Sequence, residues 1–306
     1  RRMLRTYKLN DNRIVSAENG EGDIQVYINP EIEEKRFLVE ELKIDEHTLN
    51  SALDPDEISR VEFEPDHIAL IFKMPKSYSG EEELAFRVVS TGAFLFKDRL
   101  VIVLCEDVPV FEGKQFNRVY SLRSLFLKLV NRSAYHFMEH LKVINFLTDE
   151  LEAKINKSME NRYLTNLFTL EKSLVYYLNA INSNTVVIEK LKNYSPRIGF
   201  LTEESEFLDD ILIENNQCYR QAEIYSNILA SLMDARVSIV SNNLNILIKI
   251  LNIITICIMI PTFVVSAFFM NVGIPLQGNP LAFWIIMAMA FISALGVMLI
   301  WRFKKW

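Results

Sequence analysis

Side chains that carry neutral oxygen atoms recur along residues 245–266. Together with two apolar residues, they form a series in which each member follows the last by three or four residues. Such steps place all of them on one face of an α-helix in a left-handed bundle. Amide and hydroxyl oxygens accept hydrogen bonds, so a ring of them can hold the water shell of a cation. The polar members are Asn245, Asn252, Thr255, Thr262 and Ser266, and the apolar members of the same series are Ile248 and Met259.

The segment that carries this stripe is apolar enough to lie in a membrane. Residues 250–272 contain no charged side chain, and neither do residues 281–301. Each run reaches the roughly 20 residues that an α-helix needs to cross the hydrocarbon core of a bilayer. A short turn that contains Gly and Pro joins the two runs, so we expect a helical hairpin in the membrane.

Two explanations of the polar stripe are open at this point. Ser, Thr and Asn side chains commonly form hydrogen bonds between transmembrane helices, so the stripe can serve interhelical packing. The alternative is a water-accessible pore, because polar groups in a span normally face protein or water. A single hairpin has almost no interior, whereas several copies placed side by side can turn their stripes toward a central axis.

Basic residues flank the hairpin at one end only. Lys249 precedes the first span, and Arg302, Lys304 and Lys305 follow the second, whereas the turn between the spans carries no charge. Lys and Arg are enriched at the cytoplasmic ends of spans. We therefore expect both termini, and the large part before residue 240, on the cytoplasmic side of the plasma membrane.

The part before the hairpin divides into two regions. Short β-prone runs at 68–74, 84–89, 93–96 and 100–104 are separated by turn residues such as Gly92, and a helical signal occurs near 45–60. Residues 114–195 and 200–260 contain no Gly or Pro and favour long helices, with breaks near 159 and at 194–199. At the second break, Thr202 and the acids after it provide N-terminal capping chemistry.

The predicted fold class is an α+β membrane protein. Its expected parts are a cytoplasmic α/β domain over 1–118, a helical stalk over 119–243, a first span over 244–270, an external loop over 271–280, a second span over 281–301 and a basic tail over 302–306.

Composition excludes several functions. The net charge is −6 and no basic patch is interleaved with aromatic residues, which argues against a nucleic-acid partner. Cys105, Cys218 and Cys257 share no metal-ligand spacing, so we expect plain thiols. No glycine-rich phosphate loop is visible, which argues against a pump driven by ATP hydrolysis, and we expect no cofactor.

One short pattern is typical of a different class of protein. His136, Glu139 and His140 match the His-x-x-Glu-His pattern of inverted zinc metallopeptidases, in which two histidines share a helix face. His47 and His67 are distant in the sequence, and no third-ligand motif follows. We therefore expect exposed histidines or histidines packed in the stalk, and no enzyme.

Several segments resemble one family in the same order along the chain. The first span opens with Asn245 and Lys249 and ends in Met270-Asn271, and the chain closes with Arg302-Phe-Lys-Lys-Trp306. The N-terminal region contains Leu49 and Leu53-Asp-Pro-Asp-Glu-Ile-Ser-Arg-Val-Glu62. The sequence thereby resembles the CorA family of divalent-cation channels, whose first span ends in a Gly-Met-Asn signature.

The resemblance implies a homopentamer that carries divalent cations, with hydrated Mg²⁺ first among them, down the electrochemical gradient. The stripe then lines the pore together with Leu251, and Phe269, Met270 and Asn271 form the selectivity filter. Phe269 replaces the glycine of the signature, and the outer loop lacks the acid that many members carry. The loop Val272-Gly-Ile-Pro275 is similar to that of the zinc-transporting ZntB branch, which keeps Zn²⁺ or another transition-metal dication as an alternative.

The resemblance also implies a cation sensor between neighbouring subunits. Asp210 lies at the matching place on the stalk helix, with Asp209 and Glu206 beside it, and Glu81, Glu82 and Glu83 are candidate partners from the N-terminal domain. A solvated acidic face is the alternative. For the whole chain, the competing class is a membrane-anchored structural or signalling protein that conducts no ion.

Overall fold

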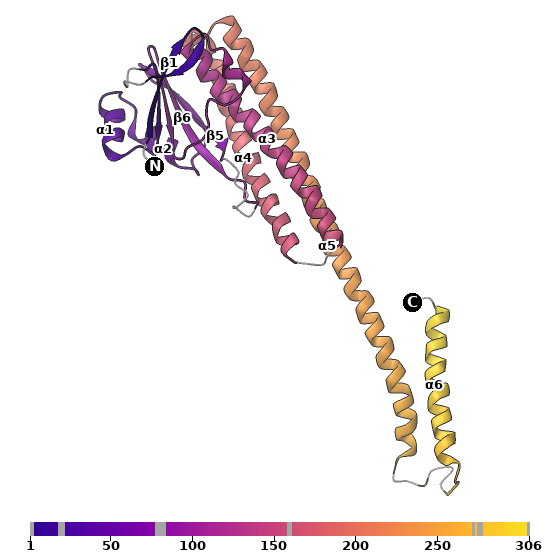
Figure 1. Cartoon of the computed structure of the whole chain (residues 1–306). Helices are drawn as coiled ribbons and strands as arrows, with labels where there is room; N and C mark the ends of the chain where they lie inside the picture. The colour runs from indigo at the N-terminus through magenta and orange to yellow at the C-terminus, as the bar shows by residue number, and fades with distance from the viewer. Residues whose placement is uncertain are drawn as a thin grey trace. The chain divides into compact units, whose positions relative to one another are not determined.

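The computed structural model describes residues 3–17, 22–76, 84–157, 161–270, 273 and 278–304. The chain forms two compact units, Arg1–Met233 and Asp234–Trp306. The first unit contains a sheet and helices α1 to α4, the second contains helix α6, and helix α5 (Thr202–Phe268) contributes residues to both (Figure 1).

The first unit is built on a seven-stranded sheet with the order β2-β1-β3-β7-β6-β5-β4. Strand β3 pairs with β7 in parallel, and the other neighbours are antiparallel. The strands are β1 (Met3–Asn10), β2 (Arg13–Ser16), β3 (Ile24–Ile28), β4 (Arg60–Phe63), β5 (His67–Pro75), β6 (Val88–Phe96) and β7 (Leu100–Leu104).

Both faces of the central strands are buried because alternate residues enter two different cores. In β7, Leu100 and Ile102 lie in one core, whereas Val101 and Val103 lie in the other. Successive side chains of a strand point to opposite faces, so a continuous apolar run is the sequence of a strand covered on both sides. The sheet is therefore the middle layer of three.

Two short helices cover one face of the sheet. Helix α1 (Ile32–Glu40) buries Leu38, and helix α2 (Glu46–Leu53) buries Leu49 and Ala52 against the sheet. A Cβ atom added to Gly92 of β6 would lie 2.6 Å from the Cβ of Ala52. Gly92 therefore lets α2 approach the strand closely and does not end the strand.

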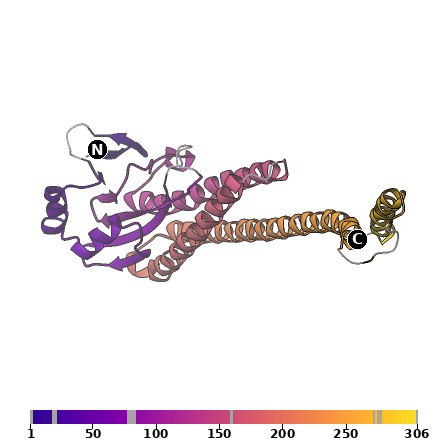
Figure 2. The same ribbon diagram turned by 90° about the horizontal axis from the view of Figure 1, so that it is seen from below.

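Three long helices cover the other face. They are α3 (Leu122–Lys157), α4 (Asn161–Ile198) and the first part of α5, preceded by a 3₁₀ turn at Lys114–Asn117. Figures 1 and 2 show these helices on the side of the sheet away from α1. Residues such as Leu125, Val187 and Leu208 pack into the core on this face.

Beyond the sheet, α3, α4 and α5 share a separate helical core. Phe137 of α3, Tyr177 of α4 and Cys218 of α5 are all fully buried in it. The chain turns from α4 to α5 at Gly199, whose φ of +75° suits glycine. At the start of α5 the Glu204 side chain accepts a hydrogen bond from the Leu201 backbone N–H at 2.9 Å, and it supplies the capping carboxylate there.

The second unit contains the C-terminal part of α5 and helix α6 (Ala282–Lys304). Both helices are long and apolar enough to cross a membrane, and almost no residue of their most apolar stretches is buried in the single chain. Exposed apolar surface of this extent requires lipid or other copies of the chain around it.

The predicted α+β class is confirmed, and two local predictions are corrected. The run 84–89 is a strand only from Val88, because Leu84 has a φ of +66° and Phe86 leaves the sheet to pack into the helical core. The runs 84–89 and 93–96 belong to one strand that passes through Gly92. The predicted break near 159 lies outside the described residues.

Candidate functional site

The polar stripe lies on helix α5 and is exposed along its whole length in the single chain. All eight candidate pore-lining side chains are exposed, including the apolar Met259 at 63%. The set consists of Asn245, Ile248, Leu251, Asn252, Thr255, Met259, Thr262 and Ser266.

A different face of the same helix segment is half-buried. At 3.6 residues per turn, the mean direction of that face differs from the mean direction of the stripe by about half a turn. The half-buried side chains of α6 also recur at steps of three and four, as in Ile286, Met289 and Ser293. This is the pattern of two helices that turn one face each toward the other, so the stripe points away from α6. Within residues 250–268 of α5, the half-buried residues are Ile253, Cys257, Pro261, Val264, Val265 and Phe268.

The threonine hydroxyls of the stripe donate their hydrogen atoms within the helix. Thr255 Oγ1 donates to the carbonyl oxygen of Leu251 at 2.8 Å, and Thr262 Oγ1 donates to that of Ile258 at 2.7 Å. A hydroxyl oxygen whose hydrogen is used in this way keeps its lone pairs as acceptors. The stripe therefore presents acceptor oxygens, which suit the hydrogen atoms of water around a cation.

Helix α5 ends at Phe268, immediately before the candidate filter residues. Phe269 donates its backbone N–H to the Ser266 carbonyl oxygen at 3.1 Å, and its side chain is 85% exposed. Met270 is also exposed, and Asn271 lies outside the described residues. The last carbonyl groups of a helix have no partner within the helix, so free acceptors occur at this end of the span.

The acidic residues of α5 that were expected to sense cations lie in the first unit. Asp209 forms an ion pair with Lys192 of α4 at 2.5 Å, and both side chains are about half exposed. Asp210 is exposed, and Glu206 precedes it by one turn on the same face. Among the described residues no three His, Cys, Asp or Glu side chains gather into a group that could hold a metal ion. Glu81, Glu82 and Glu83 lie outside them.

Glu214 extends this acidic face and was not among the candidates. It accepts a hydrogen bond from the Tyr135 hydroxyl at 2.7 Å, which raises the pKa of Tyr135 to about 12. Glu214 could have been found from the sequence, because it follows Asp210 by four residues and residues four apart are neighbours on the surface of a helix.

The histidines of the metallopeptidase pattern are buried in the helical core. His140 Nδ1 lies 2.7 Å from the Tyr177 hydroxyl, and burial lowers the pKa of His136 to about 3 and that of His140 to about 4. The Glu139 side chain is more than half exposed and forms an ion pair with Arg132 at 3.0 Å. The two histidines are packing residues of the stalk, as expected from the sequence.

Comparison with known sequences identifies relatives along almost the whole chain. A family model described as CorA-like Mg²⁺ transporter protein matches residues 26–305. The cobalt/magnesium transport protein CorA of Methanocaldococcus jannaschii is 26% identical over 294 residues, which cover 91% of this chain and 89% of that protein.

Solved structures share the fold. The complete CorA magnesium transporter of Methanocaldococcus jannaschii matches with a TM-score of 0.82 at 21% identity, covering 98% of this chain and 97% of that chain. The full-length CmaX protein matches at 0.72 with 14% identity, covering 100% and 98%. The cytoplasmic domain of ZntB from Vibrio parahaemolyticus matches at 0.60 with 13% identity, covering 79% and 98%.

Proposed function

Because the chain belongs to the family of CorA-like Mg²⁺ transporter proteins, we propose that it carries divalent cations, above all hydrated Mg²⁺, across the plasma membrane. Transport is passive and follows the electrochemical gradient. Two charges that cross a potential of 100 mV gain about 4.6 kcal/mol, so no further energy source is required. Both termini lie in the cytoplasm, because Lys249 and Arg302 flank the spans on that side.

The observation that carries the proposal is the direction of the stripe on α5. Its oxygen-bearing side chains point away from α6, and they are exposed in the single chain. Five copies arranged around an axis, with α6 outside, turn these side chains toward a shared interior. A homopentamer of this kind hides the costly polar groups from lipid and encloses a path for water and ions.

The path selects the hydrated ion by acceptor oxygens. Mg²⁺ gives up its octahedral water shell reluctantly. A site that recognises the hydrated ion therefore needs hydrogen-bond acceptors for these water molecules, and not ligands that replace them. Thr255, Thr262 and Ser266 provide rings of such oxygens along the span. We place the filter at Met270 and Asn271, where five amide oxygens face the entering ion, with Phe269 beside them.

Apolar rings on the same face provide the gate. Ile248 and Met259 of the stripe, and Leu251 beside them, carry no polar atom able to hold water strongly. A narrow ring of apolar side chains closes a pore to ions by losing its water. Asn245 then lies near the cytoplasmic exit.

Ion flux into proteoliposomes tests the proposal. We expect uptake of Mg²⁺ that Asn271→Ala lowers at least tenfold (about 1.4 kcal/mol). Asn243→Ala changes a half-buried asparagine of α5 on the side away from the stripe, and this variant should transport like the original protein. A competition series with Zn²⁺, Co²⁺ and Ni²⁺ identifies the preferred ion, and a preference for Zn²⁺ favours a ZntB-like role. Absence of flux for every ion contradicts transport and favours a membrane anchor.

A further inference from the structure

Positive charge is concentrated in the second unit of an otherwise acidic chain. This unit contains five Lys and Arg residues but only one acid, Asp234, so its net charge is +4. Since the whole chain has a net charge of −6, the first unit has −10. Residues 235–306 contain no Asp or Glu. An anionic partner can therefore approach the basic residues of the hairpin without competition from a carboxylate of the hairpin.

Two of these basic residues lie at the same level of the hairpin. Lys249 precedes the end of α5 at Phe268 by 19 residues, and Arg302 follows the start of α6 at Ala282 by 20 residues. At 1.5 Å per residue, both lie about 30 Å from the turn, which is the thickness of the hydrocarbon core of a bilayer. When the turn lies at one boundary of the core, Lys249 and Arg302 lie at the other boundary, where the lipid headgroups begin.

Arg302 lies on the face of α6 that is directed away from α5. At 3.6 residues per turn, its direction differs by about half a turn from the mean direction of Ile286, Met289 and Ser293, the residues that face α5. The Arg302 side chain is exposed in the single chain. With α6 outside α5, as in the proposed assembly, this face of α6 meets lipid.

The same face of α6 carries an apolar stripe that ends at Arg302. Phe291, Leu295 and Met298 precede Arg302 at successive steps of four, three and four residues, and all three side chains are exposed. From Phe291 to Arg302 the stripe is about 17 Å long, close to the half of the hydrocarbon core that one leaflet fills. An acyl chain that lies along the stripe therefore brings the phosphate of its own lipid to the level of the Arg302 guanidinium.

The side chains at this end of α6 suit a lipid headgroup. A guanidinium such as that of Arg302 donates two parallel hydrogen bonds to phosphate oxygens. Trp301 precedes it and is 47% exposed, and tryptophan rings favour the level at which hydrocarbon meets the headgroups. Lys249 and Lys304 add two positive charges at about the same level, which attract headgroups of net negative charge.

We propose that the charged end of α6 binds an anionic phospholipid, with an acyl chain along the stripe Phe291, Leu295 and Met298 and the phosphate on Arg302. The surplus of positive charge at this level makes the site prefer an anionic lipid to a zwitterionic one, whose headgroup carries a cation of its own. The inference rests on the proposed membrane hairpin. It does not depend on which ion the protein carries.

Quenching of tryptophan fluorescence by brominated lipids measures which lipid lies beside each end of α6. Two forms of the full chain each keep one tryptophan, Trp301 at the charged end or Trp284 near the uncharged turn, with the other two replaced by Phe. Each form is reconstituted in mixed vesicles of phosphatidylcholine and phosphatidylglycerol, with one of the two lipids brominated. We expect phosphatidylglycerol to bind about threefold or more tightly than phosphatidylcholine at Trp301, and about equally at Trp284.

Two variants separate the site from the total charge of the unit. Arg302→Gln should lower the preference at Trp301 about twofold or more. Arg236→Gln removes the same charge about 20 Å beyond Lys249 along α5, and it should leave the preference unchanged. Equal preferences at Trp301 and Trp284, or an Arg302→Gln variant that keeps the original preference, overturn the proposal. If neither lipid quenches either tryptophan, the hairpin lies outside the bilayer, and the proposed membrane insertion fails as well.

Discussion

Asn184 of α4 binds both backbone groups of Lys73 in strand β5. Its Oδ1 accepts the Lys73 N–H at 2.8 Å, and its Nδ2 donates to the Lys73 carbonyl oxygen at 2.8 Å. Strand β4 pairs only with residues 68–71 of β5, so Lys73 lies beyond the end of its neighbour. The Asn184 side chain takes the place of the missing strand and covers an edge that is otherwise open to other chains.

Replacement of Asn184 should therefore lower the stability of the first unit. Asn184→Ala leaves the Lys73 N–H without its partner, at a cost of about 1–3 kcal/mol, whereas the Lys73 carbonyl oxygen keeps the hydrogen bond that the Ser133 hydroxyl donates. We expect the unfolding temperature of the first unit to fall by several degrees. Asn182→Ala, an exposed asparagine on the same helix, is the control and should change it little. Equal stability of the two variants contradicts the strand-mimic role.

The buried histidine pair predicts a loss of stability in acid. Burial holds the pKa of His136 at about 3 and that of His140 at about 4 in the folded protein, whereas the unfolded value is near 6.5. Below pH 6.5 the unfolded chain binds more protons than the folded chain, so stability is complete above that pH and falls as the pH falls toward 4. The slope is at most about 1.4 kcal/mol per pH unit for each histidine.

Unfolding temperatures between pH 7.5 and pH 5.0 measure this effect. His136→Leu should make the dependence on pH less steep, because one buried histidine no longer titrates, while His140 and His67, whose pKa burial also lowers, still do. His47→Gln, which changes an exposed histidine, should keep the original slope. If His136→Leu keeps the same slope as well, the histidine pair is not the cause of the acid sensitivity.

Gly92 is predicted to be required for its small size. An added Cβ would lie 2.6 Å from the Ala52 Cβ, a separation that forces helix α2 away from the sheet. Gly92→Ala should cost about 1–3 kcal/mol of unfolding free energy. Ala52→Gly in the same chain removes the clashing atom, so the double variant should recover part of the loss. A double-mutant cycle with no coupling between the two positions rules out this contact as the reason for the glycine.

The acidic face of α5 predicts a response of the first unit to divalent cations. Asp210 is exposed one turn from Glu206 and Glu214, whereas Asp209 is neutralised by Lys192. We expect Mg²⁺ to protect the first unit against protease, and we expect Asp210→Ala to shift the protective concentration upward several-fold. Glu223→Gln, on another face of α5, is the matched control. An unchanged response of the double variant Asp209→Ala, Asp210→Ala contradicts the sensor assignment.

The sequence predicts the parts of the fold whose pattern is local. Breaker-free stretches predict α3, α4 and α5, and uncharged runs predict the two apolar helices. Strand β1 escapes prediction because Arg5 and Lys8 interrupt its apolar residues, as is common where one face of a strand meets solvent. From the sequence, Gly92 suggests a break between two strands. Its actual role, which is to let Ala52 approach closely, involves residues far apart in the chain and cannot be detected from one sequence.

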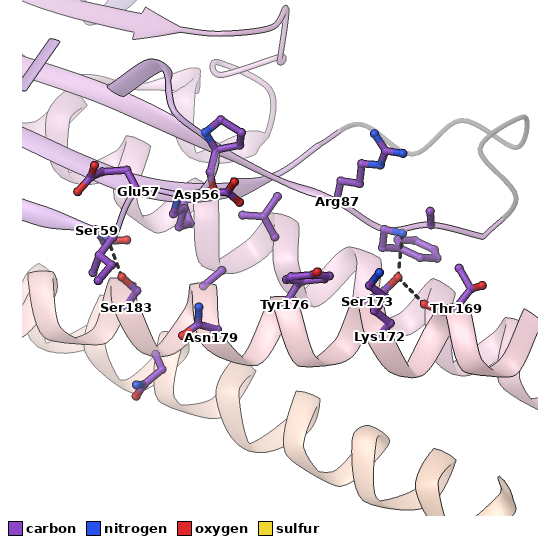
Figure 3. Close-up of a pocket in the computed structure, with 18 of the residues that line it drawn as sticks. Asp56, Glu57, Ser59, Arg87, Thr169, Lys172, Ser173, Tyr176, Asn179 and Ser183 are labelled. Atoms are coloured by element: carbon purple, nitrogen blue, oxygen red, sulfur yellow. Dashed lines mark hydrogen bonds between the residues drawn. The ribbon is translucent and has the colours of Figure 1, made fainter. Parts of the chain in front are cut away.

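In the candidate site, too, the local pattern could be predicted from the sequence and contacts between distant segments could not. Steps of three and four define the face of the stripe from sequence, because all its members lie on one helix. One groove of the first unit is lined by Arg87, Tyr176 and Asp56, which come from three separate segments (Figure 3). Only the tertiary structure brings such residues together, so no spacing in the sequence indicates the groove.

The central claim is that the oxygen-bearing face of α5 lines a water-filled path. Single cysteines placed along α5, in a chain whose three native cysteines are replaced by alanine, test it with a small cationic thiol reagent. We predict that Thr255→Cys, Thr262→Cys and Ser266→Cys react and lose ion flux, whereas Ile253→Cys and Val264→Cys on the opposite face stay unmodified. Reaction that is equal around the helix, or confined to the face toward α6, contradicts the account.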